Sequence, residues 1–246
     1  MIAISKEVRY LDEIKTYRKD FVKSDIVSRL ASFRIEPDLF GLFLIYYCGL
    51  NQYLVRPIDL YLKRAGERCR QLQFDEFSDF FGKHAREEEG HDAWAVRDTR
   101  RLIEIWNARS SIPLRPEDLT RHEKHPAIAR YHRLHEDVIA SETPFGILAI
   151  ASEVEWITVQ HGPRLLLHAL FKAGPDMTSR LSFIFRHVKA DIGHHSENKG
   201  MLARALAKDP GRLRALVRTG RRALEIYSEF LTVCLDYAQD ALRRSR

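Results

Sequence analysis

One pattern occurs twice in the chain, as HAREEEGH at residues 84–91 and as HVKADIGH at residues 187–194. In each copy a carboxylate, Glu88 or Asp191, stands four residues after one histidine and three before the next. Because an α-helix has about 3.6 residues per turn, positions i, i+4 and i+7 share a face. Each stretch therefore predicts a helix that carries two imidazoles and a carboxylate on one side. Imidazole nitrogen and carboxylate oxygen suit iron, manganese or zinc. The two stretches therefore predict two halves of one metal site.

The sequence around these stretches predicts a helical protein. Apolar residues recur at three- and four-residue spacing along nearly the whole chain, and the alternation typical of strands is scarce. This pattern, with short connections and no linker-like segment, predicts a single all-α bundle of about seven helices over residues 1–246. The expected helices cover 6–32, 37 to beyond 62 with a kink or division at Pro57, 75–108, 126–140, 144 to Gly174-Pro175, 177–206, and 210 to near the C-terminus, with a loop at 110–115.

The composition is that of an ordinary globular protein. The chain has 246 residues, of which 45% are hydrophobic, enough for a substantial core. The sequence contains no run of about 18 apolar residues, which a membrane-spanning helix would need. The N-terminus also lacks the charged-then-apolar order of a secretion signal, so a cytoplasmic protein is expected. Cys48, Cys69 and Cys234 are widely spaced and form no CxxC motif, which predicts reduced, structural thiols.

The net charge of +6 comes from 40 basic and 34 acidic side chains, and part of the excess lies near the C-terminus. A basic helix face can attract nucleic acid. However, Arg214, Arg218 and Arg221 are interleaved with apolar residues at core spacing, and no recognition motif accompanies them. We therefore expect a solvated helix face, with neither nucleic acid nor membrane as partner.

The surroundings of the two stretches favour a metal site over surface charge. A single histidine on an amphipathic helix is usually only a packing or exposed residue, and the run of Glu87, Glu88 and Glu89 is typical of a solvated face. Yet apolar residues at 80–81 and 183–185 flank the two stretches. Burial of charged carboxylates is costly unless they are paired or bind a metal. Metal binding explains both stretches with one cause.

A further carboxylate is expected on the apolar segment 145–157, which contains Glu153 and Glu155. The two are about 200° apart around a helix, so only one can face the core. Glu155 shares its face with the small residues Ala151 and Gly162, which leave room for a cluster, and it is favoured over Glu153.

Taken in order, Glu88-x-x-His91, a lone helix glutamate and His187-x3-Asp191-x2-His194 resemble the haem-oxygenase-like diiron oxidases and oxygenases. The resemblance spans residues 80–195 and implies a haem-oxygenase-like helical bundle over the whole chain. It implies six iron ligands: Glu88, His91, Glu155, His187, Asp191 and His194. His84 and His195 are left as alternative ligands or as groups that support the ligands.

The resemblance also implies an activity. Two Fe(II) ions per chain would activate the co-substrate O2 to oxidise a small organic molecule. The oxidation would be an N-oxygenation, an oxidative C–C cleavage or a desaturation, in a biosynthetic role. Manganese is the alternative metal. It leaves room for an external electron donor and suggests a homodimer. The segment after Pro37, with Phe43, Tyr46, Tyr47, Tyr53 and Arg56, is expected either to line the substrate pocket or to form ordinary core.

Three other interpretations stay open. A thiaminase-II-like enzyme on the same bundle would use a cysteine nucleophile such as Cys48 and no metal, and a relative similar to pyrroloquinoline-quinone synthase would use histidines as acids and bases. A non-enzymatic helical binding protein would use the basic last helix. Haem is disfavoured because no histidine precedes His84. A second histidine-rich patch is interpreted as solvent-exposed, and consists of His122, His125, His132 and His135.

Overall fold

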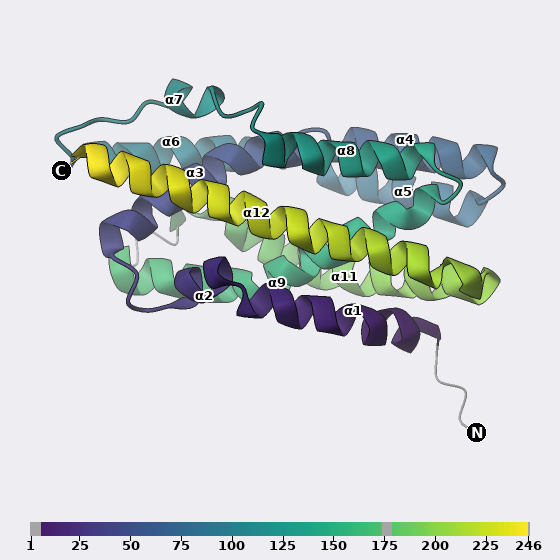
Figure 1. Cartoon of the computed structure of the whole chain (residues 1–246). Coiled ribbons are helices and arrows are strands. Elements are labelled where there is room, and N and C mark those ends of the chain that lie inside the picture. The colour runs from purple at the N-terminus through teal and green to yellow at the C-terminus, as the bar shows by residue number, and fades with distance from the viewer. Residues whose placement is uncertain (1–5, 174–178, 246) are drawn as a thin grey trace.

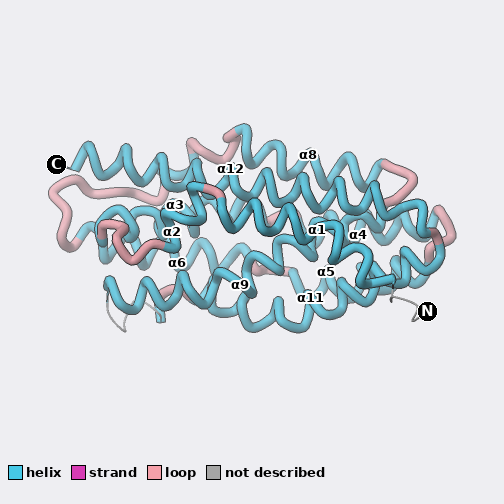
Figure 2. Tube along the Cα trace, turned by 60° about the horizontal axis from the view of Figure 1, so that its bottom comes forward, coloured by secondary structure: helices cyan, strands magenta, loops and turns pink. Residues whose placement is uncertain are grey.

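The computed structural model describes residues 6–173 and 179–245, and within them every regular element is a helix (Figures 1 and 2). Among these helices, none combines the length and apolar content that a membrane span requires. In chain order the elements are α1 (Lys6–Lys23), α2 (Asp25–Ala31), α3 (Pro37–Val55), α4 (Ile58–Gln71), α5 (Asp75–Glu88), α6 (Asp92–Asn107), α7 (Glu117–Thr120), α8 (Pro126–Ala140), η1 (Pro144–Gly146), α9 (Ile147–Ala173), α11 (Ser182–Lys208), η2 (Pro210–Arg212) and α12 (Leu213–Ser245).

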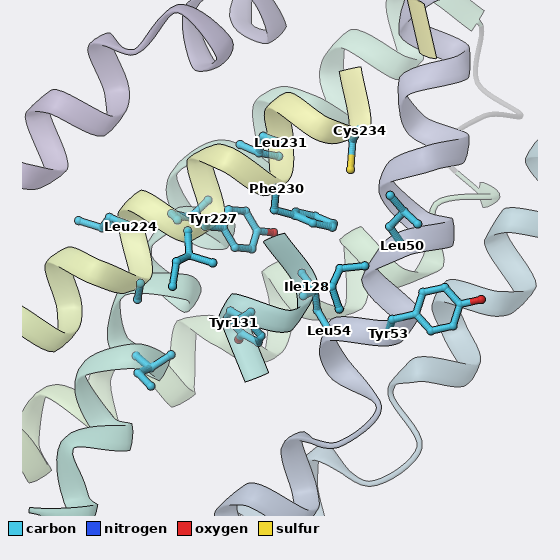
Figure 3. Packing of buried hydrophobic residues seen from close by; sticks show 14 of the residues in the cluster. Leu50, Tyr53, Leu54, Ile128, Tyr131, Leu224, Tyr227, Phe230, Leu231 and Cys234 are labelled. Carbon is cyan, nitrogen blue, oxygen red and sulfur yellow. The ribbon is translucent and has the colours of Figure 1, made fainter. Parts of the chain in front are cut away.

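The last helix, α12, forms much of the core. It crosses the bundle obliquely and packs on α1, α3, α8 and α9 (Figure 1). Its buried residues recur every three or four positions, which gives one apolar stripe along its length. Figure 3 shows Tyr227 and Phe230 of this stripe near Leu50 and Leu54 of α3 and Tyr131 of α8. The arginines at 214, 218, 221 and 222 lie on the opposite, exposed face.

The α5–α6 segment runs antiparallel to α11, which brings the two histidine-rich stretches together. Three contacts mark this order: Glu76 with Lys208, Lys83 with Glu197, and Asp98 with Ser182. The carboxylate of Asp98 also accepts a hydrogen bond from the backbone N–H of Phe183, at 2.6 Å, and so satisfies a free donor at the start of α11. This contact fixes the register of α11 against α6.

Helix α9 approaches α11 closely at Gly162. A Cβ atom at this glycine would lie 2.4 Å from the side chain of Val188, so no larger residue fits without movement. The close approach places Glu155 of α9 within reach of α11.

Two of the expected helices are divided where the sequence predicted continuity. The expected helix 6–32 ends at Lys23 and restarts at Asp25. The expected helix 75–108 ends at Glu88 and restarts at Asp92, because Gly90 adopts φ +81°, a left-handed conformation that glycine takes without steric cost. His91 therefore lies in a turn, and the prediction that it shares a helix face with His84 and Glu88 was wrong.

The other expected boundaries agree better with the structure. Pro57 divides α3 from α4, and the helix 126–140 has the expected ends. Most of the helix expected at 177–206 forms α11, which covers Ser182–Lys208. The predicted end at Gly174-Pro175 and the predicted start at Met177 lie outside the described residues.

Candidate metal centre

Three segments bring imidazoles and carboxylates together: α5 with the turn after it, α9 and α11. Their nitrogen and oxygen atoms form two groups, and within each group the atoms lie within 4.8 Å of one another. Each group contains two histidines and one carboxylate, a donor set that holds non-haem Fe(II) with coordination positions left open. The first group is His84, Glu155 and His194, and the second is Glu88, His91 and His187.

Glu88 belongs to the second group and also faces the two histidines of the first. One of its oxygens, Oε1, is 3.6 Å from Nε2 of His84 and 3.5 Å from Nδ1 of His194, while Oε2 is 2.8 Å from Nδ1 of His91. Burial raises the pKa of Glu88, but its contacts with His84 and His91 outweigh burial and hold the pKa well below its usual range. Glu88 is therefore a carboxylate that faces both groups at once.

The structure distinguishes the two glutamates of α9. Glu155 faces the cluster, with Oε1 3.8 Å from Nε2 of His84. The buried amide of Asn198 donates to both oxygens of Glu155, at 2.7 and 2.8 Å, which orients the carboxylate. Burial, followed by the charge of Asp191, raises the pKa of Glu155 well above its usual value. Glu153 faces away from the cluster and pairs with Arg18.

Different contacts orient His187, Asp191 and His194 of α11. Nδ1 of His187 lies 2.8 Å from the carbonyl oxygen of Phe183 and donates to it, which leaves Nε2 as the nitrogen available to a metal. Asp191 is buried and lies 3.7 Å from Nδ1 of His194, outside both three-residue groups. That contact is the main cause that raises the pKa of His194.

The six residues expected as ligands thus converge, and one left aside joins them. His84 is only 4% exposed, and its ring lies 4.6 Å from that of His194. His195 belongs to neither group. Burial lowers its pKa to about 4, and its charged neighbours are Lys199 and Arg18. Asn198 was missed, although it continues the spacing of His187, Asp191 and His194 by four residues.

A cavity of about 160 Å³ adjoins the cluster. His84, Glu88, Glu155, His187 and Asp191 form part of its wall. Most of the remaining wall is apolar and comes from α3, α4, α9, α11 and α12, and includes Phe43, Leu54, Leu62, Ile150, Ile184 and Leu231. Of the residues expected to line a pocket after Pro37, Phe43 and Tyr47 do so, whereas Tyr46, Tyr53 and Arg56 are not part of the wall.

None of the three cysteines contributes to this cavity wall. All three are free and buried, as the sequence predicted for structural thiols. Burial raises the pKa of Cys48 and Cys234 well above the usual value and that of Cys69 to about 12. Since the thiolate is the nucleophile, burial and a raised pKa both disfavour a nucleophilic role for these thiols.

The second histidine-rich patch is not uniformly solvent-exposed, so that interpretation was wrong. His135 is 3% exposed, stacks on Tyr61 with ring centroids 4.9 Å apart, and lines the cavity. It lies on the face of α8 that also carries Ile128, Tyr131 and Val138, and this spacing was visible in the sequence. His122, His125 and His132 are half-buried.

The buried imidazole of His135 predicts a loss of stability in acid. Burial lowers its pKa from 6.5 to about 4. Between these values the unfolded chain binds a proton that the folded chain excludes, so the free energy of unfolding falls as the pH drops from 6.5 toward 4, by up to about 3 kcal/mol. His135→Phe keeps a ring against Tyr61 and removes this titration. Urea unfolding at several pH values should show a weaker pH dependence for the variant, and an unchanged dependence would contradict the assignment.

Comparisons with known proteins bear on the fold. No protein-family model matches the chain, and no curated protein matches its sequence. A solved domain of unknown function with a haem-oxygenase-like fold, from Shewanella denitrificans OS217, superposes with a TM-score of 0.73 over 93% of this chain and 91% of that one, at 16% identity. The fold is haem-oxygenase-like. A TenA homologue from Pseudomonas syringae pv. tomato DC3000 gives a TM-score of 0.69 at 14% identity, over 93% and 92% of the two chains.

These similarities confirm the predicted all-α, haem-oxygenase-like architecture. At such low identity they show the fold alone, and one fold hosts many unrelated activities. The function must be argued from the side chains of the cluster and the cavity.

Proposed function

We propose that this protein is a non-haem diiron oxidase or oxygenase that uses O2 to oxidise a small organic substrate. The observation that carries the proposal is the pair of two-histidine, one-carboxylate groups beside an apolar cavity. Both the fold and the order of the motifs agree with the resemblance to haem-oxygenase-like diiron enzymes.

The residues divide naturally between two ions. His84, Glu155 and His194 would hold one ion, and Glu88, His91 and His187 would hold the other. Asp191, next to His194, supplies a third carboxylate. With Glu88, Glu155 and Asp191 ionised, three negative charges face two divalent cations, so the centre would be nearly charge-balanced. His84 adds a fourth imidazole to the six ligands that the resemblance implies.

The buried polar atoms of the cluster fit a metal. Nδ1 of His194 is buried and makes no hydrogen bond, since the carboxylate oxygens of Glu88 and Asp191 lie 3.5 and 3.7 Å away, whereas most buried side-chain polar atoms in proteins are paired. Three carboxylates, Glu88, Glu155 and Asp191, are also brought close together in this buried region, where their repulsion is costly. A cation would satisfy this nitrogen and offset the repulsion between the carboxylates.

Bound ferrous ions would supply the electrons that activate O2 next to the substrate. The protein's own part is to hold the ligands, exclude water and orient the substrate. The apolar wall suits a substrate with an apolar portion. Tyr47 and Tyr227 line the same cavity, and burial raises both pKa values, so both remain protonated. Their hydroxyls are 3.0 Å apart and one donates to the other, which leaves one hydroxyl hydrogen to donate to a substrate.

The metal-free alternatives explain fewer features of the site. The TenA homologue shares the fold, but Cys48, the residue that a thiaminase-like reaction would use here, lies outside the cavity wall with a raised pKa. Histidines that act only as acids and bases, as in an enzyme like pyrroloquinoline-quinone synthase, would leave the three clustered carboxylates without a role.

Anaerobic titration of metal-free protein with ferrous ion, followed by mixing with oxygenated buffer in a stopped-flow spectrometer, tests the proposal. We expect about two iron ions per chain and a transient visible absorption after mixing with O2. Parallel titration with Mn(II) compares the two metals. A wild-type protein that binds no iron would contradict the proposal and favour a metal-free enzyme or a binding protein.

A further inference from the structure

Trp94 connects the candidate metal centre with the protein surface. Its ring stacks on the imidazole of His91, with centroids 4.1 Å apart and planes inclined by 28°, and meets the ring of His187 edge-on at 5.6 Å. Both histidines belong to the group that contains Glu88. Trp94 is only half-buried. One aromatic ring therefore reaches solvent and also contacts two of the three side chains that would hold one ion.

One positive side chain contacts the Trp94 ring, and two more lie nearby on the same helix faces. The guanidinium of Arg186 lies 4.9 Å from the centre of the Trp94 ring. Arg97 follows Trp94 by three residues on α6, and Lys189 follows Arg186 by three on α11, so each pair shares a helix face. Arg97, Arg186 and Lys189 are all exposed. Such a surface attracts and orients an acidic partner and speeds its association.

We propose that an acidic protein with a one-electron centre docks over Trp94 and passes electrons through its ring to the metal centre. This inference rests on the proposed diiron function. Reduction of O2 to two waters takes four electrons, and a two-electron oxidation of the substrate supplies only two. The carrier supplies the other two in single steps. In each step the carrier is oxidised by one electron and one ferric ion is reduced to ferrous, and no bond forms or breaks in the relay.

Trp156 provides a matched control. It too is half-buried and has a guanidinium over its ring, since Arg18 lies 4.8 Å from the ring centre. Its aromatic neighbours are Phe21 and His161, however, neither of which belongs to the two ligand groups. Substitution of Trp156 removes a similar ring and cation pair that makes no ring contact with a ligand histidine.

The test measures reduction of the iron-loaded, oxidised protein under anaerobic stopped-flow conditions. Reduced plant-type [2Fe–2S] ferredoxin serves as the acidic carrier and dithionite as the small reductant. We expect Trp94→Leu and Trp94→Phe to bind as much iron as the wild type. Oxidation of ferredoxin by Trp94→Leu should be slower by about tenfold, whereas reduction by dithionite is unchanged and Trp156→Phe reacts like the wild type. Arg186→Glu should slow the ferredoxin reaction at low salt and weaken its salt dependence.

Two results would overturn the inference while leaving the diiron centre intact. One is a Trp94→Leu variant that ferredoxin reduces at the wild-type rate. The other is a variant slowed equally with both reductants, because Trp94 would then act only by positioning His91. Failure of the wild type to bind iron would instead overturn the proposed function, and iron content measured beforehand separates that outcome from the other two.

Discussion

Glu88→Gln is expected to remove iron from both halves of the metal centre. Its two carboxylate oxygens face different groups, one toward His84 and His194 and the other toward His91. Glutamine has nearly the same shape but no charge, so it leaves the helix intact while removing the one side chain common to both sets of contacts. Iron bound after anaerobic loading should fall from about two ions per chain to near zero, and the transient absorption with O2 should disappear.

Substitutions at other positions in and beside the centre test this expectation. Glu89→Gln alters the adjacent exposed glutamate and should bind iron like the wild type. His187→Ala and Asp191→Ala should lower the iron content and abolish activity, with far-UV circular dichroism unchanged. A Glu88→Gln protein that retained full iron and the O2-dependent signal would show that Glu88 is not a ligand and that the centre is built around other carboxylates.

The helical class was predictable because it depends on local periodicity. Apolar residues at three- and four-residue spacing specify an amphipathic helix whatever packs against it, and α8 has the predicted ends. The divisions at Ser24 and Gly90 were missed although each had a signal. Ser24 precedes Asp25, a sequence typical of a helix start. Gly90 is the residue type most typical of a helix end, and it follows three glutamates whose negative charge is unfavourable at a helix C-terminus.

The composition of the centre was only partly predictable. Spacing defines which side chains share a helix face, and this was enough to bring His187, Asp191 and His194 of α11 together. It does not define how α5 and α11 align, which depends on distant contacts such as those of Asp98 with Ser182 and Phe183. That alignment places the ring of His84 beside His194, a relation between residues more than a hundred positions apart.

Arg18→Met should lower the free energy of unfolding by about 3 to 5 kcal/mol, because it leaves a buried carboxylate without its partner. The side chain of Glu153 is fully buried, and Arg18 donates to its two oxygens at 2.7 and 2.9 Å. Tyr10 donates a third hydrogen bond, at 3.0 Å, and cannot supply the missing charge. Urea unfolding of the metal-free protein measures the loss.

The double variant Arg18→Met with Glu153→Gln separates the unpaired charge from the lost packing. Since glutamine removes the charge and still accepts from Tyr10, the double variant should recover much of the stability lost in Arg18→Met. Glu153→Gln should also keep its iron, whereas Glu155→Gln, two residues away on the face that meets His84, should lose iron. A loss below about 1 kcal/mol in Arg18→Met would mean that solvent reaches Glu153, since exposed ion pairs contribute no more than this. The two glutamates of α9 are thus expected to have different roles, Glu153 in folding stability and Glu155 in metal binding.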